Sequence, residues 1–80
     1  MRLDKYLKVS RIIKRRTVAN EACDAGRVLV NGKTARASYD VKVNDIIELS
    51  LGQNITKYQV LVVTEYATKE SATEMFKAIK

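Results

Sequence analysis

The residues of this sequence best suited to chemistry are basic, and they gather in its first 17 positions. Arginine suits phosphate because its planar guanidinium group donates two hydrogen bonds to adjacent oxygens, and lysine adds a compact positive charge. Thr17 and the free N–H groups at the start of a following helix could add an anion site. These residue types therefore predict contacts to a phosphate backbone. The predicted contact residues are Arg2, Lys5, Lys8, Arg11, Lys14, Arg15, Arg16 and Thr17.

The distribution of charge also favours a polyanionic partner. The formal net charge is +6, yet residues 1–36 carry ten Lys and Arg against three acidic residues, whereas residues 37–80 carry five against six. All of the positive excess therefore lies in the N-terminal part. A merely solvated surface would more often intersperse the two signs. Such asymmetry in a small domain predicts binding to a polyanion such as a nucleic acid.

Catalytic and metal chemistry have little support. The sequence has no histidine for general base work, no glycine-rich phosphate loop, and no Cys/His/Asp cluster with metal-ligand spacing. The single cysteine, Cys23, cannot form an internal disulfide and is predicted to be a small buried residue on a helix. We therefore predict a protein without catalytic residues, metal or cofactor. Because it shows no signal peptide and no apolar run near about 18 residues, we expect a cytoplasmic, membrane-independent protein.

The first predicted helix covers residues 1–8. Leu3 and Leu7 lie four positions apart and form a narrow apolar stripe, and Asp4 can pair with Lys8 at the same spacing. The helical pattern then breaks into a basic elbow, whose cations cannot all be buried without partners. A locally helical elbow would place two of its arginines on one face, namely Arg11 and Arg15.

The second predicted helix covers residues 18–25. Thr17 is the expected N-cap, and Gly26 is the left-handed residue expected to end the helix. Its core-facing residues are small, which allows close packing against the first helix. The residues expected on this face are Val18, Ala22 and Ala25, with Ala19 and Cys23 beside it.

After residue 26 the pattern changes to short strands. Asn31-Gly32 is the strongest two-residue hairpin signal, and further turns are predicted at Asn44-Asp45 and over residues 52–54. Hairpin-linked strands are expected to be antiparallel. The predicted strands cover residues 28–30, 33–38, 46–51 and 55–65, with an alternating pattern at 39–43.

The C-terminal stretch predicts a third helix. Residues 71–74 fit a capping box, and four apolar residues recur at helical spacing through residue 79. A helix over residues 71–79 is expected to lay this stripe on the sheet. The predicted fold is α+β, with two N-terminal helices packed on a small antiparallel sheet and a short C-terminal helix. We expect an RNA-binding domain over residues 1–66, with a C-terminal helix over 67–80 packed on it.

Charge alone does not separate RNA from DNA. The second helix offers few base-reading side chains beyond Asn20, whereas a major-groove reader needs several. The four tyrosines and one phenylalanine predict no stacking platform of the kind that single-strand binders use. Recognition of backbone and shape remains, which suits structured RNA. Two alternatives stay open, a small DNA-binding regulator and a protein-interaction adaptor whose basic face meets an acidic partner.

Three segments resemble the RNA-binding domain first described in the fourth small-subunit ribosomal protein, the alpha-L RNA-binding motif. They are Arg2-Leu3-Asp4-Lys5-Tyr6-Leu7, Lys14-Arg15-Arg16-Thr17 and Gly26-Arg27-Val28-Leu29-Val30-Asn31-Gly32-Lys33. Residues 40–47 resemble the segment that follows, with Asn44 where the family usually has glycine. The likeness covers about residues 1–52 and implies two helices packed on a small antiparallel sheet.

This resemblance also implies which residues face RNA. Asn31 is first of all a turn residue, so its inclusion rests on position alone. The residues that match the family's RNA-facing motif are Arg2, Lys5, Lys14, Arg15, Arg16 and Thr17, and the likeness extends to Lys8, Arg11, Asn31 and Lys33.

A free-standing domain of this size is similar to bacterial ribosome-quality-control factors related to the fifteen-kilodalton heat-shock protein. That similarity implies binding to 23S rRNA and peptidyl-tRNA on obstructed large (50S) ribosomal subunits. It also implies a protein partner, a tailing factor that adds alanine to the stalled nascent chain. The expected protein is a ribosome-associated monomer in the cytoplasm.

Overall fold

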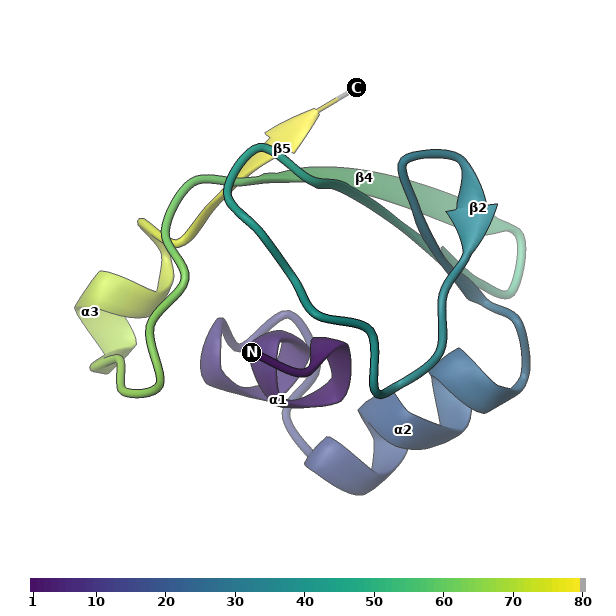
Figure 1. Ribbon diagram of the computed structural model, residues 1–80, viewed down its shortest axis with the longest axis horizontal. Coiled ribbons are helices and arrows are strands. Elements are labelled where there is room, and N and C mark those ends of the chain that lie inside the picture. The colour runs from purple at the N-terminus through teal and green to yellow at the C-terminus, as the bar shows by residue number, and fades with distance from the viewer. Residues whose placement is uncertain (80) are drawn as a thin grey trace.

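Two N-terminal helices lie against one side of a five-stranded antiparallel sheet in the computed structural model, which describes residues 1–79 (Figure 1). Helix α1 covers Leu3–Val9 and helix α2 covers Arg16–Asp24. The strands lie in the order β2-β1-β3-β4-β5, and all neighbours are antiparallel. The predicted α+β architecture is confirmed. The strands are β1 (Val28–Val30), β2 (Lys33–Thr34), β3 (Ile46–Leu51), β4 (Asn54–Val60) and β5 (Phe76–Ile79).

Helix α1 is held in place by its apolar stripe and by its first turn. Leu3, Tyr6 and Leu7 are fully buried in the core, as their helical spacing requires. The first N–H groups of a helix have no intrahelical acceptor. Here the Leu3 N–H donates to the Tyr39 carbonyl at 2.8 Å, so the loop after β2 completes the helix start. The basic side chains that flank this stripe therefore project from a fixed element.

Helix α2 begins earlier than predicted. It starts at Arg16, and Arg15 occupies the N-cap position without a side-chain hydrogen bond, so the prediction of Thr17 as the N-cap is wrong. Small apolar residues occur around much of this helix, and their spacing alone did not select the inward face. Gly26 has the predicted left-handed backbone, with φ of 74°. The buried residues are Ala19, Ala22 and Cys23, whereas Val18 and Ala25 are exposed.

The turns of the sheet follow the sequence closely. Asn31 and Gly32 both have positive φ, 53° and 83°, which is the backbone of the tight type I′ hairpin between β1 and β2. Asn44 has φ of 77°, so asparagine takes the left-handed position where glycine is usual. Residues 35–45, in contrast, form a loop and not the predicted strands, because their backbone bonds are made with the start of α1 as well as with the sheet.

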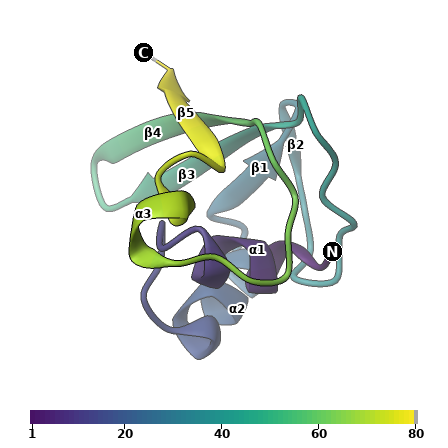
Figure 2. The same cartoon turned by 90° about the vertical axis from the view of Figure 1, so that its left-hand side faces the viewer.

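The C-terminal segment differs most from its prediction. Helix α3 is a single turn, Lys69–Ala72, and its capping box pairs Thr68 with Ser71. The predicted helix over residues 71–79 is wrong beyond Ala72, because β5 pairs antiparallel with the free edge of β4 (Figure 2). A nine-residue helix is marginal by itself, whereas an open strand edge offers a full set of backbone partners. The same apolar residues still reach the core, since Met75 is buried and Phe76 half-buried.

Tyr6 ties α1 to this C-terminal segment. Its buried hydroxyl donates to the Met75 carbonyl at 2.9 Å, and burial raises the pKa of Tyr6. Replacing Tyr6 with phenylalanine should lower the free energy of unfolding by about 1 kcal/mol, the contribution of one hydrogen bond. Urea denaturation measures this change. Because the residue lies beneath the surface, RNA affinity should stay unchanged, and a loss of affinity would contradict a purely structural role.

Candidate nucleic-acid interface

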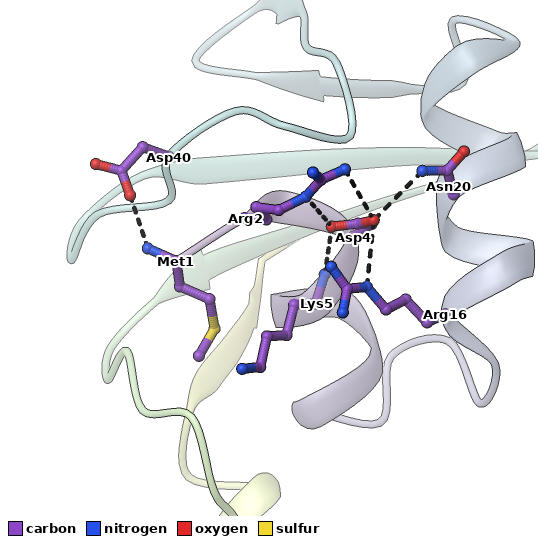
Figure 3. A network of polar contacts seen from close by, with 7 residues as sticks. All are labelled: Met1, Arg2, Asp4, Lys5, Arg16, Asn20 and Asp40. Atoms are coloured by element: carbon purple, nitrogen blue, oxygen red, sulfur yellow. Dashed lines mark hydrogen bonds and ion pairs between the residues drawn. The ribbon is translucent and has the colours of Figure 1, made fainter.

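A buried carboxylate joins the two helices at their basic surface (Figure 3). The side chain of Asp4 on α1 is 3% exposed and accepts hydrogen bonds from both helices. Its donors are Arg2 Nε at 3.2 Å and Nη2 at 3.4 Å, the Lys5 backbone N–H at 2.8 Å, Arg16 Nε at 3.3 Å and Asn20 Nδ2 at 3.3 Å. We call Arg2, Asp4, Arg16 and Asn20 the Asp4 cluster. The predicted pairing of Asp4 with Lys8 is wrong, because the carboxylate turns toward α2.

The carboxylate of Asp4 stays charged in this setting. Burial by itself would raise the pKa of Asp4, but the hydrogen bonds from Arg2, Asn20 and Arg16 and from the Lys5 N–H outweigh it and lower the pKa. At neutral pH an ionised Asp4 therefore fixes the directions of two guanidinium groups that come from different segments of the chain.

The two arginines of the Asp4 cluster remain open to solvent. The side chains of Arg2 and Arg16 are 51% and 49% exposed. Arg16 donates to Asp4 through Nε, and its two terminal nitrogens make no hydrogen bond within residues 1–79, so they can meet a phosphate in the bidentate manner. Thr17 and Asn20 line a shallow groove of about 360 Å³ beside Arg16. This part of the surface combines fixed guanidinium groups with hydroxyl and amide groups.

A second group of cations lies where α1 ends. Lys8, Arg11 and Lys14 line a groove of about 380 Å³ together with Val9 and residues 65–67. We call this the elbow groove. The elbow is a turn with bends, so the predicted helical alignment of Arg11 with Arg15 is wrong. None of the salt bridges within residues 1–79 involves the three cations of the groove.

Arg11 adopts a backbone conformation that normally belongs to glycine. It follows the C-cap of α1, and its φ is 64°. The left-handed region costs a side-chain-bearing residue on the order of 1 kcal/mol. Arg11→Gly should therefore raise the free energy of unfolding by about 0.5–1 kcal/mol in urea denaturation, while RNA affinity falls.

Arg11→Ala is the matched control for that variant. Alanine keeps the unfavourable φ but removes the guanidinium group, so RNA affinity should fall as far as in Arg11→Gly, without the gain in stability. Undiminished RNA affinity in both variants would contradict a binding role for Arg11.

The remaining predicted residues of the first 17 positions lie around these two groups. Lys5 pairs with Glu65 at 3.5 Å, and its side chain is 35% exposed. Arg15 is exposed at the start of α2, and Thr17 is exposed one residue into that helix. The structure thus brings Arg2 and Arg16 together, and separately Lys8, Arg11 and Lys14.

The first 47 residues match the S4 domain family, so the match covers both helices, β1, β2 and the start of β3. Over nearly the full chain, the sequence is 53% identical to the RQC P-site tRNA stabilizing factor of Streptococcus pneumoniae, covering 99% of this chain and 90% of that protein. It is 48% identical to the factor of the same name in Bacillus subtilis, covering 100% of this chain and 93% of that protein. The chain belongs to the S4-domain family of RQC P-site tRNA stabilizing factors.

The solved structures agree with this assignment. The trimeric structure of heat shock protein 15 from Vibrio cholerae matches 99% of this chain and 81% of that chain, with a TM-score of 0.90 and 25% identity. The predicted resemblance to an S4-type domain, to ribosome-quality-control factors and to the heat-shock relative is confirmed. The RNA-binding character of the chain follows from its S4 domain.

Asn31 and Lys33 of the S4 domain lie at the β1–β2 hairpin, in a different groove. The Asn31 amide donates to Asp45 at 3.1 Å and its oxygen accepts from the Ile46 N–H at 3.0 Å. Tyr39 OH donates to the same carboxylate at 2.9 Å. Asn31 therefore has a clear structural role in the turn, and its contact to RNA stays a prediction. Lys33 is exposed.

The described residues offer no reactive thiol, no cluster for a metal ion and no membrane-spanning helix. Cys23 is buried as predicted, and burial, with the nearby Asp4 and Asp24 charges, raises its pKa to about 11, so the thiol stays protonated. Within residues 1–79, His, Cys, Asp and Glu side chains form no group of three or more that could hold a metal ion. In the same range, no helix has the length and apolar character needed to span a membrane.

Sequence reasoning missed three residues of this surface. Asp4 lies three positions before Leu7 and so falls on the buried side of α1, a signal that could have revealed its role as a buried anchor. The sequence suggests only base reading for Asn20, whereas in the structure its amide donates to Asp4. Tyr66 lies far along the chain from the elbow that it adjoins, and no local pattern marks it.

Proposed function

We propose that this S4-domain protein binds 23S rRNA and peptidyl-tRNA on obstructed large ribosomal subunits and supports alanine tailing of the stalled nascent chain. The observation that carries the proposal is the Asp4 cluster, in which one buried carboxylate directs two half-exposed arginines toward solvent. Two such guanidinium groups fit a folded RNA that presents phosphates at fixed positions, since each can take two oxygens.

The names of its relatives support the same site of action. The Streptococcus pneumoniae and Bacillus subtilis proteins are named RQC P-site tRNA stabilizing factors. We infer a binding role without catalysis, exercised as a monomer on ribosomes in the cytoplasm, in company with the factor that adds the alanine tail. In this role the basic surface binds both tRNA and rRNA. The tailing factor carries out the addition of alanine.

Co-sedimentation tests the proposal. Purified protein is mixed with large subunits that carry peptidyl-tRNA, and separately with vacant large subunits, and each mixture is sedimented through sucrose at low salt. We expect the protein in the large-subunit fraction, with more bound when peptidyl-tRNA is present. A protein that stays at the top of both gradients at low salt would contradict ribosomal binding.

Two further measurements separate the alternatives. Fragments of 23S rRNA should displace the protein from subunits better than duplex DNA of equal length does, and the opposite order would favour a DNA-binding regulator. Ribonuclease treatment should release the protein from its complexes. If the complexes resist ribonuclease, the basic surface binds an acidic protein instead.

A further inference from the structure

Tyr66 presents its ring to solvent beside the elbow of the RNA-binding surface. It is 88% exposed, whereas Tyr6 is fully buried and Tyr58 packs edge-on against Phe76 with 5.2 Å between ring centroids. Tyr66 belongs to the segment between β4 and α3, which runs alongside α1 in the views of Figures 1 and 2. The fold thus brings one exposed aromatic ring from the C-terminal part of the chain to the basic N-terminal part.

The backbone of Tyr66 is held in a defined turn. The Thr64 hydroxyl donates to the Tyr66 carbonyl at 3.1 Å, and the Tyr66 N–H donates to Thr64 Oγ1 at 3.4 Å. On either side, Val63 and Ala67 pack against the core. An aromatic ring on an ordered backbone binds a flat ligand with less ordering cost than a ring on a mobile loop.

Three cations line the elbow groove together with Tyr66, namely Lys8, Arg11 and Lys14. One carboxylate, Glu65, also lines the groove, and it pairs with Lys5 at 3.5 Å. The groove therefore keeps a positive excess. Its volume of about 380 Å³ is near the lower end for ligand sites, which suits one flat group and not a helix or a strand.

We propose that the elbow groove binds one unpaired nucleotide of a structured RNA, with its base stacked on Tyr66 and its flanking phosphates held by Lys8, Arg11 and Lys14. A base within a duplex has both faces covered by its neighbours, whereas an unpaired base can offer a face to an aromatic ring. The inference rests on the proposed RNA-binding function and specifies which feature of the RNA this groove recognises. In this arrangement the Asp4 cluster binds the phosphate backbone of the folded RNA, and the elbow groove selects an unpaired base.

Two RNA hairpins that differ by a single bulged nucleotide test the proposal. The full chain is titrated against a fully paired hairpin and against the same hairpin with one unpaired nucleotide in its stem, at low salt. We expect tighter binding to the bulged hairpin. Tyr66→Ala should lose about fivefold or more in affinity for the bulged hairpin and keep its affinity for the paired one, because stacking of one base is worth at least about that factor. Tyr66→Phe should bind both hairpins as the unaltered protein does.

A fluorescent variant reports on the groove itself. The sequence contains no tryptophan, so Tyr66→Trp introduces a single indole at the site. Its emission should be quenched by the bulged hairpin and much less by the paired one, since quenching requires a base against the ring. Urea denaturation of all Tyr66 variants should match the unaltered protein because the side chain is exposed.

The outcomes distinguish failure of the nucleotide site from failure of the proposed function. Equal affinity of Tyr66→Ala and the unaltered protein for the bulged hairpin would overturn the nucleotide site and leave RNA binding intact. Failure to bind either hairpin, or large subunits, would overturn the proposed function and this inference with it. If Tyr66→Ala kept its RNA affinity but lost the tailing factor from ribosomal complexes, the groove would be a protein contact and the inference wrong.

Discussion

Replacing Asp4 with alanine is expected to lower the free energy of unfolding by about 2 to 3 kcal/mol and to weaken RNA binding by more than about tenfold. The stability loss arises because the Asn20 amide and the Lys5 N–H lose their shared acceptor and two guanidinium groups are left close together without an anion between them. The affinity loss arises because Arg2 and Arg16 keep their charges but lose the fixed orientation that suits phosphate. Urea denaturation and titration with large subunits measure the two effects.

The pH dependence of stability gives an independent check on Asp4. Its pKa in the folded protein lies below the ordinary value of 3.8, so the unfolded chain binds the proton more readily. The contribution of Asp4 to stability is therefore fully present above about pH 4 and is lost as the pH falls through the folded pKa. Asp4→Asn should unfold with a weaker dependence on pH below about pH 4 than the unaltered protein.

Two comparisons isolate this effect. The pKa of Asp40 is also lowered, by the hydrogen bond from the amino group of Met1, but this contribution is present in both proteins and cancels in the difference (Figure 3). Glu48→Ala is the matched control for Asp4→Ala, because it removes a carboxylate that pairs with Lys57 at 3.5 Å on the sheet. The side chains of Lys57 and Glu48 are 50% and 26% exposed, so the loss of this surface pair should cost less than about 1 kcal/mol and leave RNA affinity unchanged. Equal effects of Asp4→Ala and Glu48→Ala would contradict the anchoring role.

The parts of the fold that the sequence predicts well are those whose causes are local. Leu3 and Leu7 define α1 by spacing, Gly26 ends α2, and Asn31-Gly32 is a turn that few other dipeptides can form. Strand β5 was missed because its apolar residues recur at helical spacing and do not alternate strictly, so the local pattern favours a helix over a strand. Pairing with the free edge of β4 decides between them, and that edge is distant in sequence.

For the candidate site, too, the sequence predicts some features and not others. The cations at residues 2–16 can be named from the sequence, because the excess of Lys and Arg over acidic residues in this stretch is locally evident. Their grouping is not visible, since it depends on Asp4 reaching across to α2 and on the segment around Tyr66 returning to α1. Sequence reasoning therefore predicts what the surface binds better than it predicts which residues act together.

The double variant Arg2→Ala/Arg16→Ala is expected to bind large subunits about 100-fold more weakly than the unaltered protein, since each charged hydrogen-bonding contact to phosphate contributes about 1.5 kcal/mol. The salt dependence should change as well. Each lost phosphate contact lowers the slope of log affinity against log salt by slightly less than 1, so the slope should fall by about 2. Titrations between about 50 and about 200 mM salt measure both quantities.

The matched control for this variant removes the same charge from the other face of the sheet. Lys57 lies opposite Glu48, whose neighbours Ile47 and Leu49 point into the core, so Lys57 points away from the helices, as does Lys77 by its pairing with Gln59. Lys57→Ala/Lys77→Ala lowers the net charge by the same amount. If it weakened binding as much as Arg2→Ala/Arg16→Ala, total charge and not the Asp4 cluster would govern the affinity. If only the arginine variant loses affinity and slope, the phosphate contacts lie where the two helices meet.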